Sequence, residues 1–340
     1  MRNTTLKVLD CTFRDGGYYN DWFFKPETVR AYLECIDAAG VDIVELGFRL
    51  PPQKEFRGPF AYSTDRFLQS LNVPSRLRIA VMVNARDLLE QPGSMVDSVS
   101  KLFAPRADSL VSIVRIATHL RDVERCDELA GALRELGYEV GLNLMQIGGK
   151  SLADINRLVA AVQNWRTVDV LYFADSLGSM TPDDVRPLVS ALADSWNGEL
   201  GIHTHDNMGL ALVNALAAVE AGATWIDGTV LGMGRGAGNA RTEHLLVELV
   251  RRYHAEYNPA ALFPLVLEDF EQLRKQYGWG PNLLYYLSAA YGIHPTYVQE
   301  MLARNHHESH QIIQGLETLR NSGSQASFQS GVLNQALLGV

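Results

Sequence analysis

The sequence predicts a (β/α)8 barrel of the TIM type with a helical C-terminal extension, and three features of its 340 residues support this fold class. Short apolar or β-branched runs recur with centres about 27 to 36 residues apart, the length of one strand–loop–helix–loop unit. Stretches of helical period lie between these runs, and the chain is long enough for one large barrel with an appendage. We expect strands at 6–11, 41–48, 77–83, 110–117, 139–144, 168–173, 199–204 and 225–231.

The helical stretches carry recognisable start and stop signals. The segment 27–39 places its apolar residues on one face and stops at a glycine. The segment 210–221 is rich in Ala and Leu and ends at Gly222, a residue that suits a C-terminal cap. Thr181 followed by Pro182 gives another helix a hydroxyl cap and a proline at its first position.

Eight such units close a barrel of about 250 residues, which we place at residues 1–252. A six-stranded doubly wound sheet is the alternative, but it leaves two strands without a role, and no GxGxxG follows the first strand. Residues 253–320 carry helical patterns broken by prolines, so we expect a helical extension there. The segment 321–330 is rich in Ser, Gln and Gly, so we expect a flexible tail at 321–340.

Composition is that of an ordinary globular protein and argues against several function classes. Apolar residues make up 47% of the chain, charged residues 20%, and the formal net charge is −9. The basic residues are scattered, which disfavours nucleic acid, and no uncharged apolar stretch of about 18 residues suits a membrane span. Three widely spaced cysteines and the lack of an apolar signal segment before the first strand lead us to expect a cytoplasmic protein.

In a barrel of this kind, side chains at the C-terminal ends of the strands converge on one open end, where active sites form. Polar and charged residues follow most of the predicted strands, a concentration that the fold itself does not need. They are Arg14, Asp15, Tyr18, Glu45, Asn84, Arg115, Thr118, His119, Asn143, Gln146, Asp175, His203, His205, Arg235 and Asn239.

Two histidines at the end of the seventh predicted strand are the sharpest signal. His203 and His205 are two residues apart, so on a strand both imidazoles point to the same face and can reach one ion. Imidazole and carboxylate ligands suit a divalent ion of the Mn, Mg, Co or Zn group. A carboxylate such as Asp15 would complete a three-ligand face, and an ordinary polar strand end is the alternative interpretation.

Two glycine-rich segments flank this site. Arg14 and Asp15 precede two glycines, which allow a tight turn. One interpretation is an ordinary surface ion pair. In the other, Asp15 binds the metal and Arg14 faces an oxygen that becomes negative during the reaction. Residues 232–239 contain four alternate glycines, which allow close approach to a ligand or a mobile loop. A phosphate loop is disfavoured, because no Lys-Ser/Thr pair follows.

Together these segments resemble the DRE-TIM metallolyase superfamily, which is named for its Asp, Arg and Glu, over about residues 7–245. The segment 114–119 and the helical part after the barrel are most similar to the 4-hydroxy-2-oxovalerate aldolase branch. Several spaced motifs occur in the order that the superfamily shows. The matching segments are 12–16, 44–45, 174–178, 203–210 and 238–243.

The resemblance implies a metal site and a reaction. Asp15, His203 and His205 would be the metal ligands, and Asn239 falls where hydroxymethylglutaryl-CoA lyases supply a further ligand. The expected cofactor is Mn²⁺, Mg²⁺ or Co²⁺, with Zn²⁺ less favoured. The expected reaction cleaves or forms the C–C bond of a 4-hydroxy-2-oxo acid, and its products are pyruvate, released through its enolate, and an aldehyde.

The resemblance also implies roles for other residues. Arg14 would stabilise the enolate and Glu45 would be a supporting carboxylate, so we count both as catalytic. The aldolase branch has a histidine for proton transfer three residues after the metal Asp, whereas this sequence has Tyr18, a poor base with an ordinary pKa of about 10. Either Tyr18 is activated and is the acid/base group, or a metal-bound water takes over this role, or the substrate differs. We expect substrate contacts from Arg14, Arg115, Asn143, Asp175 and Arg235.

Two other functions stay open. A Claisen-type acyl-CoA lyase or acyltransferase would use the same metal, but Arg235 stands in the glycine-rich segment where the hydroxymethylglutaryl-CoA lyases have a cysteine. A catalytically idle partner subunit is favoured only by Tyr18 and by the extra helical part. We expect a homo-oligomer as the default, and the resemblance further implies an aldehyde dehydrogenase as a possible partner.

Overall fold

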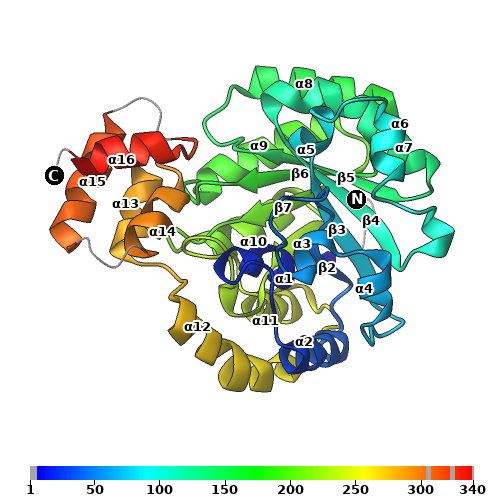
Figure 1. Cartoon of the computed structure of the whole chain (residues 1–340), viewed down its shortest axis with the longest axis horizontal. Coiled ribbons are helices and arrows are strands. Elements are labelled where there is room, and N and C mark those ends of the chain that lie inside the picture. The colour runs from blue at the N-terminus through cyan, green and yellow to red at the C-terminus, as the bar shows by residue number, and fades with distance from the viewer. Residues whose placement is uncertain (1–5, 304–307, 322–325, 339–340) are drawn as a thin grey trace.

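The computed structural model describes residues 6–303, 308–321 and 326–338. Its centre is a closed barrel of eight parallel strands in sequential order, in which the last strand pairs with the first (Figure 1). The predicted fold class is confirmed. The strands are β1 (Lys7–Asp10), β2 (Ile43–Phe48), β3 (Arg78–Asn84), β4 (Val111–His119), β5 (Glu139–Met145), β6 (Val170–Asp175), β7 (Glu199–Thr204) and β8 (Trp225–Gly228).

All eight predicted strands are present, and most of the predicted bounds differ from the observed ones by only a few residues. The exception is the last prediction, 225–231, because β8 stops at Gly228 and a 3-10 turn, η4 (Val230–Gly232), follows it. Leu231 has a left-handed φ of 52°, which no strand residue adopts.

Helices surround the barrel, as the predicted repeat requires. The predicted capping signals are present: Thr181 and Asp184 form a capping box, and Gly222 ends its helix in the left-handed conformation. Short helices also occupy the loops after several strands. The helices up to residue 253 are α1 (Thr12–Gly16), α2 (Pro26–Ala38), α3 (Pro59–Tyr62), α4 (Asp65–Gln69), α5 (Ala85–Leu89), α6 (Met95–Ser100), α7 (Asp127–Glu135), α8 (Leu152–Trp165), α9 (Pro182–Ser195), α10 (Ala211–Ala221) and α11 (Thr242–Tyr253).

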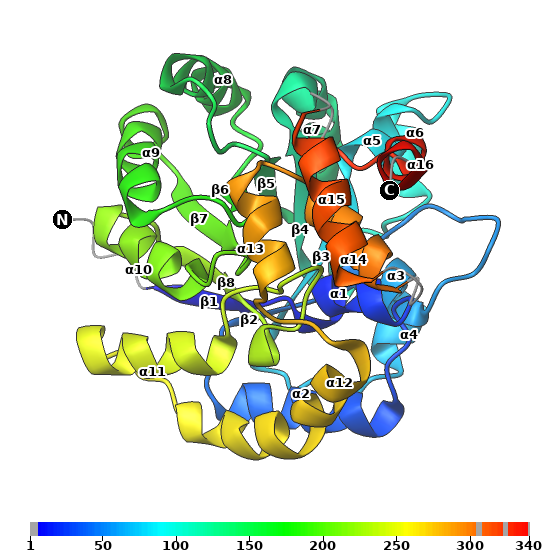
Figure 2. The ribbon, with the colours of Figure 1, turned by 90° about the vertical axis from the view of Figure 1, so that its left-hand side faces the viewer.

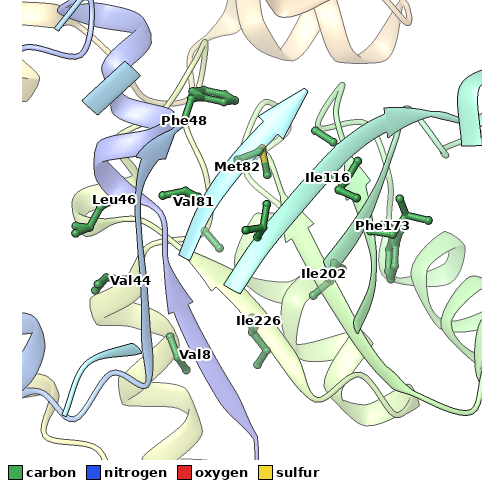
Figure 3. Packing of buried hydrophobic residues seen from close by; sticks show 14 of the residues in the cluster. Val8, Val44, Leu46, Phe48, Val81, Met82, Ile116, Phe173, Ile202 and Ile226 are labelled. Atoms are coloured by element: carbon green, nitrogen blue, oxygen red, sulfur yellow. The ribbon is translucent and has the colours of Figure 1, made fainter. Parts of the chain in front are cut away.

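Alternation along the strands divides the core into two layers. Val44, Val81 and Ile202 belong to the layer between the strands and the helices (Figure 3). A smaller cluster, which includes Leu9 and Trp225, belongs to the other face of the strands and fills the barrel. Because the lower part of the barrel is filled by apolar side chains, the polar groups gather at the C-terminal ends of the strands.

Only helices and turns follow β8 in the described part of the chain, which confirms the expected helical character of the C-terminal part. A π-helical segment, η6 (Leu265–Phe270), leads into α12. The later helices lie across the C-terminal ends of the strands in both views, so they cap the open end of the barrel (Figure 2). They are α13 (Leu283–Ala290), α14 (Pro295–Ala303), α15 (Ser309–Arg320) and α16 (Ser330–Leu338), whereas α12 (Glu271–Tyr277) lies at the side of the barrel near α2.

The prediction of a flexible tail at 321–340 is wrong for 330–338, which form α16. Leu333 and Ala336 are three residues apart, so they lie on one face of the helix, and both are buried in the apolar core of α13–α15. The prediction of a flexible tail was based on the polar composition of 321–330 and did not consider the apolar periodicity of 330–338. The proposed domain boundary at residue 252 stays a prediction.

Among the helices of the described residues, none combines the length and the apolar character that crossing a membrane requires.

Candidate metal centre

The two histidines and the aspartate meet at the open end of the barrel. His203 is on β7 and His205 directly follows it, and the centroids of the two rings are 4.9 Å apart. Asp15 comes from α1, the short helix that follows β1. Its Oδ2 lies 3.7 Å from Nε2 of His203 and 4.0 Å from Nε2 of His205. All three residues are buried.

These three side chains fit one divalent ion. Imidazole and carboxylate ligands lie about 2.0–2.2 Å from such an ion, so two of them are at most about 4.4 Å apart when they share it. The observed distances lie within this limit. Nε2 of His203 is buried and has no hydrogen-bond partner among the described residues. A buried polar atom usually has a partner, so a metal ion bound at this nitrogen would explain its position.

The other ring nitrogens fix the tautomers that metal binding needs. Nδ1 of His203 lies 2.9 Å from Oδ2 of Asp227, and Nδ1 of His205 lies 2.9 Å from the backbone oxygen of Asp175. Because both partners are acceptors, each Nδ1 carries the proton, and each Nε2 presents its lone pair to the site.

The charges of the site favour a cation. Burial opposes ionisation of Asp15, but Arg14 and the two imidazoles override it and hold the pKa of Asp15 well below its ordinary value. Burial would also lower the pKa of His203, but Asp15 and Asp227 raise it above its ordinary value. His203 therefore lies in a negative potential. Burial and the neighbouring His203 lower the pKa of His205 to about 3, so its imidazole stays neutral.

Arg14 is held beside the metal ligands with one donor to spare. Its Nε donates to Glu45 and its Nη1 to Asp15, each over 2.7 Å. Its Nη2 is buried and has no hydrogen-bond partner in the described part of the chain. Arg14 can therefore bind an oxygen that becomes negative next to the ion, while Glu45, which is fully buried, positions it.

Arg115 does not reach the open end of the barrel. It is fully buried, its Nη2 donates to Asp227 over 2.6 Å, and its Nη1 lies 3.3 Å from Glu45. Its guanidinium also stacks over the ring of Tyr172, 4.1 Å from the centroid. The structure thus places Arg115 among carboxylates beneath the site and does not bring it to a substrate position.

Asp175 is likewise engaged by its own loop. Its carboxylate accepts the backbone N–H groups of Ser179 and Met180, and burial raises its pKa to about 6 despite these bonds. Its contribution to the site is the backbone oxygen that orients His205. Asn143, on β5, is buried, and its Oδ1 has no partner among the described residues, so it stays available to a substrate.

The glycine-rich loop closes the site from the side of β8. Asn239 donates from its amide nitrogen to Oδ2 of Asp15, while its buried Oδ1 has no partner among the described residues. Arg235 lies 5.6 Å from the ring of Tyr18. Tyr18 is 38% exposed, and the partial desolvation of its phenol raises the pKa of Tyr18 above its ordinary value, which Arg235 opposes. Tyr18 is therefore a protonated phenol near neutral pH.

A family model described as HMGL-like matches residues 5–264. The chain belongs to the HMGL-like family. A curated 4-hydroxy-2-oxovalerate aldolase of Pelotomaculum thermopropionicum is 34% identical over 251 residues, which cover 72% of this chain and 70% of that protein. An oxaloacetate decarboxylase of Mycobacterium tuberculosis is 31% identical over 252 residues, 73% of this chain and 70% of that protein. The solved N-terminal domain of a candidate aldolase from Bacteroides vulgatus superposes with a TM-score of 0.80 and 33% identity, over 88% of this chain and 97% of that one.

Membership in the HMGL-like family confirms the predicted superfamily and the prediction of a metallolyase. The individual roles of the site residues stay predictions. Sequence reasoning missed Asp227, which orients His203 and pairs with Arg115. The signal was available, since Asp227 stands in the apolar run of β8 and an aspartate there needs a partner.

A second group of possible ligands, Cys11, His203 and Asp227, lies deeper in the barrel of this HMGL-like protein. It shares His203 with the first group but would need its Nδ1, which already donates to Asp227. Burial also raises the pKa of Cys11 well above its ordinary value, so the thiol stays protonated. The group of Asp15, His203 and His205 therefore fits an ion better than this second group does.

Proposed function

We propose that this protein is a divalent-metal-dependent pyruvate aldolase, which cleaves a 4-hydroxy-2-oxo acid between C3 and C4 or forms that bond. The observation that carries this proposal is the juxtaposition of Asp15, His203 and His205 with the spare donor of Arg14. The name of the curated aldolase relative at 34% identity supports the same reaction.

The bound ion would supply Lewis acidity at the 2-oxo group of the substrate. We propose Mn²⁺, Mg²⁺ or Co²⁺ rather than Zn²⁺, because Asp15, Asn239 and two substrate oxygens add hard oxygen ligands to the two imidazoles, a set that suits six-coordinate ions. Asn239 would need its amide turned from the present orientation, in which the nitrogen faces Asp15.

The protein groups then act on the substrate as follows. Nη2 of Arg14 donates to the 2-oxo oxygen, which gains negative charge as C3–C4 breaks and the enolate forms. Because the Nε and Nη1 atoms of Arg14 are held by Glu45 and Asp15, the donor is in place before the reaction. Asn143 and Arg235 remain candidates for contacts with the substrate carboxylate.

Tyr18 is the proposed partner for the proton of the 4-hydroxyl group. Its raised pKa makes it a weak acid that matches an alkoxide better than an ordinary phenol does, so it can return a proton to the C4 oxygen in the direction of condensation. In the cleavage direction the same step needs the phenolate, so the rate of cleavage should rise with pH.

The proposal is tested by the release of pyruvate. Chelated protein is given Mn²⁺ and a set of 4-hydroxy-2-oxo acids, and pyruvate is followed with lactate dehydrogenase. We expect turnover that needs the ion and is lost on addition of chelator. Arg86→Gln changes an exposed arginine that pairs with Glu90, and it should leave this turnover unchanged. An absence of pyruvate with every substrate and ion would contradict the proposal.

A Claisen-type reaction with an acyl-CoA is the alternative, and thiol release from acyl-CoA in place of aldehyde formation would establish it. Arg235 disfavours this alternative for the reason already given. A cytoplasmic location, a homo-oligomer and an aldehyde dehydrogenase partner stay predictions from the sequence.

A further inference from the structure

The four helices α13–α16, called the cap below, contact the glycine-rich loop of the metal site, residues 232–239. The backbone N–H of Gly236 donates to Oε1 of Gln299 on α14 over 3.3 Å. A Cβ atom built on Gly236 would lie only 2.9 Å from Cβ of Pro295, and Ala237 packs into the apolar core of the cap. The turn before α14, which contains His294, is therefore held against the loop that carries Asn239.

His294 lies near three basic side chains at the open end. Arg235 of the loop, His205 at the end of β7 and His119 at the end of β4 are close enough to affect the pKa of its imidazole. Burial lowers the pKa of His294 most, followed by the cation of Arg235 and the two neighbouring imidazoles, and together they bring it to about 2. Its imidazole is therefore neutral at any pH at which the protein would work.

The tautomer of His294 follows from its neighbour. The backbone N–H of Thr296 donates to Nδ1 of His294 over 3.3 Å, so Nδ1 is an acceptor and the proton of the neutral ring is on Nε2. The described residues provide no hydrogen-bond partner for this Nε2–H group. His294 thus offers a donor that cannot become a cation.

A pocket lies where the cap meets the rim of the barrel. Its volume is about 150 Å³, and His119, Met145 and Gln146 line it from the barrel side. Ser327 lines it from the cap, and Gln146 donates to the backbone oxygen of Ala326 over 2.9 Å. A cavity of about this size can hold a molecule of up to six carbons, and the walls here are largely polar.

We propose that His294 donates a hydrogen bond from Nε2 to the C4 oxygen of the substrate, which is the aldehyde oxygen of the second product. We further propose that the pocket beside His119 receives the rest of a short, polar aldehyde. The inference rests on the proposed aldolase function. A neutral imidazole polarises a carbonyl without transferring charge to it, because it donates without being a cation.

This inference assigns the two halves of the reaction to different parts of the chain. The ion and Arg14 come from the barrel and handle the pyruvate half. The family model ends at residue 264, so the cap, and His294 with it, lies beyond the matched region. The aldehyde specificity of this protein would therefore reside in residues that its family membership does not describe.

Two reactions of the same enzyme separate these halves. Cleavage of a 4-hydroxy-2-oxo acid needs the C4 oxygen, whereas decarboxylation of oxaloacetate also yields pyruvate enolate but has no C4 hydroxyl or aldehyde. We expect His294→Phe to lower kcat for cleavage about 100-fold, the effect of removing one donor to a reacting oxygen. Decarboxylation should change less than about threefold. His294→Gln, which keeps an N–H donor, should recover part of the cleavage rate.

The controls address folding and the pocket. His310→Phe alters an exposed histidine on α15 and should change neither reaction, and thermal unfolding should show that both phenylalanine variants are folded. Ser327→Trp fills the pocket and should lower kcat/KM for addition of a four-carbon hydroxyaldehyde at least about tenfold more than for acetaldehyde.

The outcomes are distinct. If the wild-type protein with Mn²⁺ produces pyruvate from neither substrate, the proposed function fails. If it cleaves the hydroxy acid and His294→Phe cleaves it equally well, or loses both reactions alike, the proposal for His294 is overturned and the aldolase function stands.

Discussion

Asp227→Asn is the variant that most directly tests the construction of the metal centre. Oδ2 of Asp227 lies 2.9 Å from Nδ1 of His203 and 2.6 Å from Nη2 of Arg115. The substitution keeps the size of the side chain but replaces one acceptor by a donor. Because both donors meet the same oxygen, an amide nitrogen in its place would oppose His203 and Arg115 together, and the imidazole proton would have to move to Nε2 and block the ion. With the amide oxygen in that place both hydrogen bonds are kept, but the negative charge that orients His203 and pairs with Arg115 is lost.

The two consequences differ in size and can be measured separately. Loss of an acceptor behind a metal-bound histidine typically weakens metal binding about 10- to 100-fold, or about 1.4 to 2.7 kcal/mol. Removing a partner from a buried charge costs about 3–5 kcal/mol of folding stability. Arg115 keeps Glu45 at 3.3 Å, so we expect a loss near the lower end of that range.

Calorimetric titration of the chelated protein with Mn²⁺ measures the first effect, and urea unfolding measures the second. The double variant Asp227→Asn/Arg115→Met removes the unpaired cation, so it should regain stability but not metal affinity. Glu199→Gln, a carboxylate-to-amide change at the start of β7 that meets Lys7 over 2.8 Å, is the matched control and should leave Mn²⁺ binding unchanged. A single variant that binds Mn²⁺ within about twofold of the wild type would refute the proposed orientation of His203 by Asp227.

Three further predictions concern the same end of the barrel. His203→Ala should abolish Mn²⁺ binding in calorimetry and pyruvate formation while the circular dichroism spectrum is kept; retained turnover would remove His203 from the ligand set. Tyr18 is proposed to take the proton of the 4-hydroxyl group, and the pKa of Tyr18 is raised above its ordinary value of about 10. The kcat for cleavage should therefore rise about tenfold per pH unit up to about pH 10, and Tyr18→Phe should flatten this profile. An unchanged profile would contradict the assignment. Burial raises the pKa of Glu243 from 4.5 to about 7, so its folded state favours the proton. The stability that the protonated Glu243 contributes is complete below about pH 4.5 and is lost as the pH rises through 7. Urea unfolding should therefore show the wild type losing about 3 kcal/mol of unfolding free energy relative to Glu243→Gln between about pH 4.5 and 8. An equal pH dependence of the two proteins would refute the raised pKa.

The parts of the site that the sequence revealed depend on local geometry. Residues two apart on a strand share a face, so His203 and His205 could be paired without knowing the rest of the barrel. A turn directly after the first strand must lie at the open end, so Asp15 could be placed near them. Periodicity and spacing were sufficient for the eight strands for the same reason.

The partners of the buried charged residues could not be predicted, because they depend on how deep each residue lies in the barrel and on the register of the strands. Arg115 stands on an inward-facing position of β4, but its height in the barrel and its partners on β2 and β8 follow from the stagger of strands far apart in the chain. We therefore expected a substrate contact where the structure has a buried ion-pair network. Asp227 could have been recognised as a carboxylate in an apolar strand that needs a partner, but its pairing with Arg115 depends on the same stagger.

The cap shows a different limit of sequence reasoning. Its helices could be predicted, but nothing local to α13–α16 indicates that they fold back over the ends of the strands. That contact matters chemically, because an enolate forms next to a cation in the barrel whatever the aldehyde is, whereas the aldehyde must be bound by whatever covers the opening. Loops and appendages at the C-terminal face are where barrels of one fold differ in specificity. Under the two proposals made above, the barrel of this chain supplies the pyruvate chemistry and its cap supplies the group that binds the second product.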